Sequence, residues 1–154
     1  MSLMEKMKVR LDLQNPSQWK RIPSNEQFIA WLSAALAGKY DSAEVTIRLV
    51  GEEESAQLNS QFRGKSGPTN VLSFPFEPPP AVPIMDFLGD LVICVPLVSR
   101  EAQALGKAPI AHWAHLVIHG ALHLLGYDHQ TEAQALEMES LEARLLQSLG
   151  FPEP

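Results

Sequence analysis

Two absences in the sequence exclude whole classes of protein. Cys94 is the only cysteine, so an internal disulfide cannot form, and its apolar neighbours from Leu91 to Val95 predict a buried core thiol. No stretch has the roughly eighteen consecutive apolar residues of a membrane span, and the N-terminus lacks the basic-then-apolar pattern of a signal peptide. We therefore expect a soluble, cytoplasmic protein.

Positive charge is also scarce. Lys and Arg number 12 against 18 Asp and Glu, which gives a formal net charge of −6. This balance argues against broad, purely electrostatic binding of nucleic acid, although a local basic groove is compatible with it.

What is present is the composition of one ordinary globular domain. The chain has 154 residues, of which 45% are hydrophobic and 19% charged. A chain of this size buries about two thirds of the surface that it exposes when unfolded. No internal repeat divides it, so we interpret residues 1–154 as a single domain, with Met1-Ser-Leu3 as a cloning remnant.

Hydrophobic periodicity predicts four strands and five helices in the order βαβαββααα. The predicted strands are 9–13, 45–50, 69–76 and 88–95. The predicted helices are 28–36 with its cap at Ser24 and Gln27, then 52–62, 96–105, 109–125 and 131–149. A proline-rich loop at 78–83 separates the last two strands. This order is typical of one α+β, or mixed α/β, domain in which helices cover a mixed sheet of about four strands.

Three of the five histidines lie in the eleven residues HGALHLLGYDH, which span 119–129. Helical residues four apart lie about 40° from each other around the axis, so His119 and His123 share one face. Gly126 can adopt the left-handed conformation that ends a helix, and the resulting turn can bring His129 back to the pair. Three converging imidazoles favour a divalent ion such as zinc and leave a fourth position open, as in catalytic sites.

Three further residues lie close to these histidines, and two of them, His115 and Asp128, allow more than one interpretation. His112 lies almost two turns from His119 and is expected to be structural. His115 is one turn away, and is either structural, a support behind the metal ligands, or a substrate contact. Asp128 either orients His129 through a hydrogen bond or caps the next helix.

The spacing of the three histidines and the glycine is also that of the metzincin proteases, H-E-x-x-H-x-x-G-x-x-H. Those enzymes need the glutamate after the first histidine as a general base, and here that position is Gly120. We expect the missing side chain to remove this base and to open space above the metal. Peptide hydrolysis is therefore disfavoured.

Taken with two further motifs, the histidine segment resembles a known family, the YbeY-type bacterial ribosomal RNA maturation factors. The other two motifs are Arg63-Gly-Lys65 with Pro68-Thr-Asn-Val-Leu-Ser-Phe-Pro75, and Leu88-Gly-Asp-Leu-Val-Ile93. Members of this family are regarded as metal-dependent endoribonucleases specific for single strands. The resemblance implies that His119, His123 and His129 bind one zinc ion and that Arg63 is the functional arginine. Many members carry aspartate where this chain has Asn70.

The chemistry of phosphodiester cleavage fits these residues. A metal can lower the pKa of a bound water to about 7, and a guanidinium binds phosphate oxygens through two parallel hydrogen bonds. Together with Arg63, Lys65 forms a local basic patch, which is compatible with the negative net charge of the whole chain. Thr69, Asn70 and Ser73 either contact the substrate or serve the turn before the strand.

The leading hypothesis is therefore a zinc-dependent endoribonuclease that acts in ribosomal RNA maturation and ribosome quality control. Its expected partners are ribosomal RNA and the small ribosomal subunit, with no DNA and no membrane. Two alternatives stay open: a zinc metallopeptidase, and a non-catalytic ribosome assembly factor with a structural metal. For the general base, the candidates are a second water, Asp128, His115 and the phosphate itself.

Overall fold

The computed structural model describes residues 7–80 and 86–152. Met1-Ser-Leu3 and positions 81–83 of the proline-rich loop lie outside the described residues. The elements, in chain order, are β1 (Lys8–Gln14), α2 (Asn25–Leu36), β2 (Ser42–Val50), α3 (Glu52–Arg63), β3 (Val71–Pro75), β4 (Phe87–Cys94), α4 (Val95–Leu105), α5 (Pro109–Leu124) and α6 (Glu132–Ser148). Each predicted strand and helix is found, with its ends shifted by a few residues at most.

The four strands form one mixed sheet in the order β1-β2-β4-β3. β1, β2 and β4 run parallel, and β3 pairs antiparallel with β4 at the edge. The predicted fold class, a single α+β domain with a mixed sheet of four strands, is thereby confirmed.

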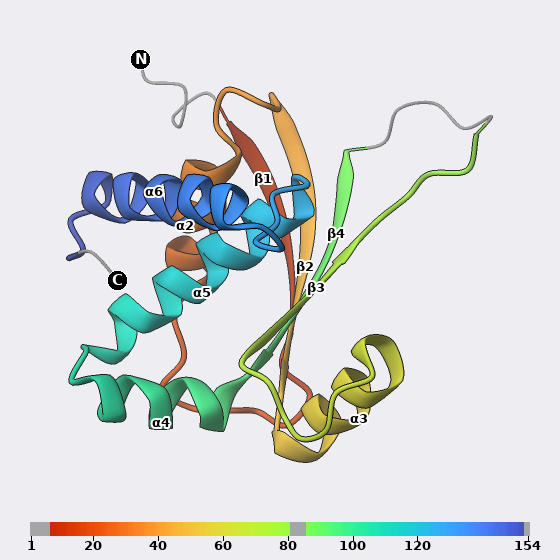
Figure 1. Ribbon diagram of the computed structural model, residues 1–154, viewed down its shortest axis with the longest axis vertical. Helices are drawn as coiled ribbons and strands as arrows, with labels where there is room; N and C mark the ends of the chain where they lie inside the picture. Colours follow the sequence, from red (N-terminus) through yellow and green to blue (C-terminus); the bar gives the residue numbers. More distant parts are fainter. Residues whose placement is uncertain (1–6, 81–85, 153–154) are drawn as a thin grey trace.

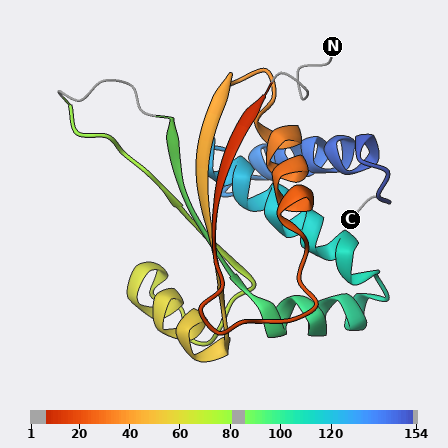
Figure 2. The ribbon, with the colours of Figure 1, turned by 180° about the vertical axis from the view of Figure 1, so that it is seen from behind.

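Helices cover the two faces of the sheet unequally. Figures 1 and 2 show α2, α5 and α6 on one face and α3 on the other. The larger core lies under α2 and α5, where Phe28 contacts Trp31 and Trp113 edge to face. A smaller cluster lies under α3 and holds the fully buried thiol of Cys94, as predicted.

Helix α5 crosses the main core and is apolar around most of its circumference. Between Ala111 and Leu124, the partly exposed residues are His115, His119 and His123, spaced one turn apart, and the other residues of this stretch are buried. The histidines thus form the single polar stripe along an otherwise buried helix. None of the described helices is both long and apolar enough to cross a bilayer.

The turn after α5 reverses the chain, as its glycine predicted. Gly126 has a φ of +100°, and the amide of Tyr127 donates to the carbonyl of Leu122 over 3.1 Å. The next helix, α6, starts with a capping box of Thr131 and Gln134. This short connection between two fixed helix ends positions His129.

Candidate metal centre

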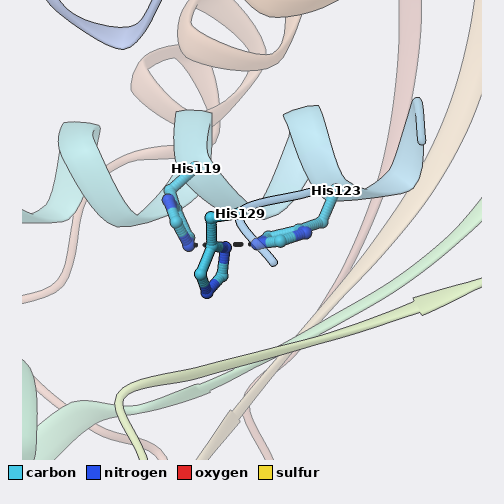
Figure 3. Close-up of side chains that lie close together, drawn as sticks. All are labelled: His119, His123 and His129. Carbon is cyan, nitrogen blue, oxygen red and sulfur yellow. Dashed lines mark hydrogen bonds between the residues drawn. The ribbon is translucent and has the colours of Figure 1, made fainter. Parts of the chain in front are cut away.

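Three imidazoles converge beside the C-terminal end of α5. His119 and His123 project from adjacent turns of the helix, and His129 approaches them from the following turn (Figure 3). Nε2 of His119 lies 3.2 Å from Nε2 of His123, and one ring nitrogen from each of the three histidines lies within 4.8 Å of the others. The structure therefore brings together the three residues that the motif singled out.

This spacing fits a shared divalent cation. In a tetrahedral zinc site with roughly 2.0–2.1 Å bonds to nitrogen, two ligand nitrogens are about 3.3 Å apart. The 3.2 Å between His119 and His123 is close to that separation. His129 has a half-exposed side chain, so solvent can reach the open side of the group. Three imidazoles with one accessible side can accept zinc and leave a position for a water or a substrate oxygen.

Electrostatics favours the neutral, metal-binding form of His123. Burial lowers the pKa of His123, and the neighbouring His119 and His129 lower it further because a second or third positive charge in the group is unfavourable. Neutral imidazole is the form that offers a lone pair to a metal ion.

Glu142, on α6, supports the centre from behind, a role that was not predicted from the sequence. Its carboxylate is almost fully buried and accepts from both His119 and His115: Oε2 lies 2.7 Å from His119 Nδ1, and Oε1 lies 2.8 Å from His115 Nε2. Burial alone would raise the pKa of Glu142, but the hydrogen bonds with His115 and His119 outweigh it and lower the pKa to about 2.

The ionised carboxylate fixes the proton of His119. An ionised carboxylate only accepts hydrogen bonds, so Nδ1 of His119 must carry the proton. The lone pair of a neutral His119 is then on Nε2, which is the nitrogen that faces His123. Carboxylates orient zinc-bound histidines in this way. The signal in the sequence was a spacing of four: Met138, Glu142 and Leu146 are the buried residues of α6, so one carboxylate interrupts an apolar stripe.

His115 belongs to this support and not to the cleft described below. It lines a neighbouring hollow of about 530 Å³ between α5 and α6, which shares His119 and His129 with that cleft and is also lined by Met138, Glu139 and Glu142. His115 does not line the cleft and its Nε2 is bound to Glu142, which favours its interpretation as a support behind the metal ligands. His112 is buried, and its Nε2 lies 2.9 Å from Glu101 on α4, which agrees with a structural role.

Asp128 holds the backbone next to His129. Its Oδ1 accepts from the His129 amide over 2.7 Å and lies 4.0 Å from the ring nitrogen Nδ1. The carboxylate thus shapes the turn that presents His129, without a direct hydrogen bond to the ring. Its alternative role as the cap of α6 is wrong, because Thr131 caps that helix.

A cleft of about 880 Å³ opens in front of the three histidines. Arg63 and Lys65 line it from the end of α3 and the loop that follows, and Asp128 is its only carboxylate among the described residues. None of the ion pairs formed within the described ranges involves Arg63 or Lys65. Both cations are therefore available to an anion, which gives this acidic protein the local basic groove that the sequence analysis allowed for.

Two buried polar residues of α3 hold the loop that carries these cations. The hydroxyl of Ser55 donates to the Thr69 carbonyl over 2.8 Å and accepts from the Thr69 amide over 2.9 Å. Asn59 donates to the carbonyl of Gly67 over 2.9 Å. These hydrogen bonds hold the loop at Gly67 and at Thr69. Because Thr69 is bonded to Ser55, β3 starts at Val71 and not at the predicted residue 69.

Asn70 and Ser73 line the cleft, but their side chains already have partners. Asn70 donates to both carboxylate oxygens of Glu101, over 3.0 and 3.3 Å. Ser73 donates to the carbonyl of Gly120 over 3.1 Å and so ties β3 to the histidine helix. These contacts agree with a structural role in the turn and the strand for both residues.

The expectation that Gly120 opens space above the metal is wrong. A Cβ on Gly120 would lie 2.9 Å from Cδ2 of Leu91 and 3.3 Å from Cγ2 of Val71, both of which are sheet side chains. The glycine therefore faces the sheet and allows α5 to approach β3 and β4 closely. A glutamate at this position would point into the core, away from the function it has in the proteases.

Comparisons with known proteins place the chain among named relatives. A family model described as Endoribonuclease YbeY matches residues 13–150. The chain is 50% identical over 149 residues to a protein of Nitrosococcus oceani named Endoribonuclease YbeY, and the match covers 96% of this chain and 97% of that protein. Among solved structures, it is similar to the solution structure of a Thermotoga maritima protein, with a TM-score of 0.56 and 26% identity over 92% of this chain and 91% of that one.

Proposed function

Because the chain belongs to the Endoribonuclease YbeY family, we propose that it is a zinc-dependent endoribonuclease that cuts single-stranded RNA during ribosomal RNA maturation and ribosome quality control. The family membership supports RNA as the substrate. The proposal also includes the zinc ion, the small ribosomal subunit as partner, the absence of DNA among the substrates and the cytoplasm as the place of action.

One observation carries this proposal. The three histidines line the same cleft as Arg63 and Lys65, two cations that have no ion-pair partner among residues 7–80 and 86–152, although the two groups lie more than fifty positions apart in the sequence. A metal centre beside cationic side chains is suited to a polyanion, because the metal centre can act on the reacting phosphate while the cations hold the strand. A peptide bond carries no charge that would use these cations.

In the proposed reaction, His119, His123 and His129 hold the zinc ion. A zinc ion bound there supplies Lewis acidity and lowers the pKa of a water ligand, which provides a nucleophile at neutral pH. Arg63 binds the oxygens of the phosphate and stabilises the negative charge that grows during cleavage. Lys65 attracts the neighbouring backbone. Glu142 is a positioning residue that keeps the lone pair of His119 directed at the metal.

The candidates for the general base can be narrowed by position. His115 lies outside the cleft and already donates to Glu142, so it is not placed to take a proton from the substrate. Asp128 lines the cleft beside His129 and is the carboxylate nearest in sequence to a metal ligand. Its accessible oxygen makes it the protein group best placed to accept a proton there.

Metal content and RNA cleavage, measured together, test the proposal. Protein purified without a metal-affinity tag should contain about one zinc per chain, lose RNA cleavage with a chelator and regain it with added zinc. His129→Ala should lose both zinc and cleavage, whereas Gln130→Ala, a neighbour that also lines the cleft, should retain both.

The same experiment separates the two alternatives. Cleavage of a peptide instead of RNA by the zinc-restored protein would favour the metallopeptidase. If pure protein never cuts RNA but His129→Ala still abolishes ribosome maturation in cells, the non-catalytic assembly factor with a structural metal is favoured.

A further inference from the structure

Phe62 is a large apolar side chain left open to solvent inside the cleft. Five large hydrophobic residues are exposed on the described part of the chain: Tyr40, Phe62, Phe76, Leu105 and Leu136. Of these, Phe62 alone lines the cleft that holds the three histidines, and it is 57% exposed. Single exposed hydrophobic side chains are ordinary on protein surfaces, so the informative feature of Phe62 is its position in the cleft, where a ligand can cover its ring.

The ring is nevertheless held in place. Phe62 lies in the last turn of α3, and its ring meets that of Phe74 on β3 at a centroid distance of 5.2 Å and an interplanar angle of 76°. Phe74 in turn packs against the smaller core cluster under α3. A T-shaped contact of this kind fixes the ring while most of its surface stays accessible.

The neighbours of Phe62 identify the kind of ligand. Arg63 follows it directly, and Lys65 lies two residues further along the same wall of the cleft. A flat apolar ring beside two free cations matches the alternation of flat base and charged phosphate along a nucleic acid strand. An apolar protein segment would leave both cations without a partner, which disfavours a protein ligand for this wall.

We propose that Phe62 is a stacking platform for one unpaired nucleobase of an RNA strand whose adjacent phosphate is bound by Arg63. This inference rests on the proposed function and adds to it a source of strand preference. Bases within a duplex are already stacked and paired, so only a base that is free to leave its neighbours can lie on the ring. The platform thus selects single-stranded RNA without reading its sequence.

An abasic scan tests the platform. Binding of a short single-stranded RNA to chelated full-length protein is measured with the intact strand and with strands that lack one base at each position in turn. For the parent protein, removal of the base that stacks on Phe62 should weaken binding about 5- to 100-fold, the range expected for a single stacked base. Phe62→Ala should bind the intact strand more weakly by a similar factor and should no longer respond to the missing base at that position.

Two further variants control the test. Phe62→Trp should keep the parent affinity. The tryptophan fluorescence of this variant should change when the intact strand binds but not when the strand lacking the stacked base is added. This measurement tests the platform even if Phe62→Ala does not fold. Phe76→Ala removes another exposed phenylalanine ring, 37% exposed, that lies outside the cleft, and this variant should bind as the parent does.

The outcomes separate the platform from the proposed function. If the parent binds and cuts RNA but Phe62→Ala keeps the parent's affinity and its full response to the abasic scan, the platform is wrong and the proposed function stands. A parent that neither binds RNA when chelated nor cuts it when zinc is restored overturns the proposed function, and the platform with it.

Discussion

Oε2 of Glu142 lies 2.7 Å from Nδ1 of His119, and this contact joins α6 to α5 directly behind the three histidines. Its position gives a carboxylate outside the cleft an influence on the metal centre within it. The carboxylate fixes which nitrogen of His119 carries the proton, so the opposite nitrogen keeps a lone pair that can bind a metal ion. The docking of α6 on α5 is therefore part of the site and not only of the fold.

Replacing this carboxylate should weaken metal binding. Glu142→Gln has the same shape but loses the charge that favours a protonated Nδ1 on His119, and we expect zinc affinity to fall about 10- to 100-fold. Competition with a chromophoric chelator measures the affinity. Glu139→Gln is the matched control, because Glu139 lines the same hollow but is exposed. Equal affinities for the parent and Glu142→Gln would show that the contact does not position His119.

Removal of Arg63 should impair cleavage and leave the metal in place. Arg63→Ala loses a phosphate contact that strengthens as charge develops, and we expect the cleavage rate to fall about 100-fold or more with zinc content unchanged. Arg63→Lys keeps the charge but not the two parallel hydrogen bonds, so its rate should lie between those of the parent and Arg63→Ala. Single-turnover RNA cleavage and metal analysis measure both quantities.

The control for charge is Arg144→Ala, which removes an exposed arginine of α6 that lies outside the cleft. It should cut RNA at the parent rate. An Arg63→Ala protein as fast as the parent would remove Arg63 from the reaction.

The elements of this fold could be predicted from the sequence because their signals are local. Alternation in the strands, the capping boxes at Ser24 and Thr131 and the glycine at 126 each act within a few residues. The same local geometry placed His119 and His123 together. The strand order β1-β2-β4-β3 has no local signal, because it depends on which strands meet after the chain collapses.

The residues that were missed or misjudged depend on contacts between distant segments. Glu142 lies 23 positions from His119 and reaches it only because α6 packs on α5. For Asn70 the sequence left a substrate contact and a role in the turn both open, and the structure shows that its side chain donates to Glu101, 31 positions away. Gly120 was judged by comparison with a protease motif, whereas the packing of α5 on Leu91 decides its surroundings.

A glutamate at position 120 should destabilise the protein rather than create a protease. In Gly120→Glu the new side chain would press on the buried Leu91 and carry a charge into the core, which we expect to cost about 3 kcal/mol or more. Urea unfolding measures this loss, and a peptide assay tests for the new activity. Gly120→Ala, which adds only a methyl group, should cost less. A stable Gly120→Glu protein that cuts peptides would mean that position 120 faces the metal.

Glu142 should also make the metal-free protein sensitive to acid. Its pKa is lowered from 4.5 to about 2 in the folded state, so the folded protein binds fewer protons at this site than the unfolded chain does within that range. The stabilisation is present in full above pH 4.5 and is lost as the pH falls from 4.5 towards 2. In Glu142→Gln this part of the pH dependence should disappear, since an amide does not titrate. Urea unfolding of chelated parent and variant, compared at several pH values across this range, measures the difference. If the free energy of unfolding changed with pH in the same way for the two proteins, the carboxylate would not be held by His115 and His119 in solution.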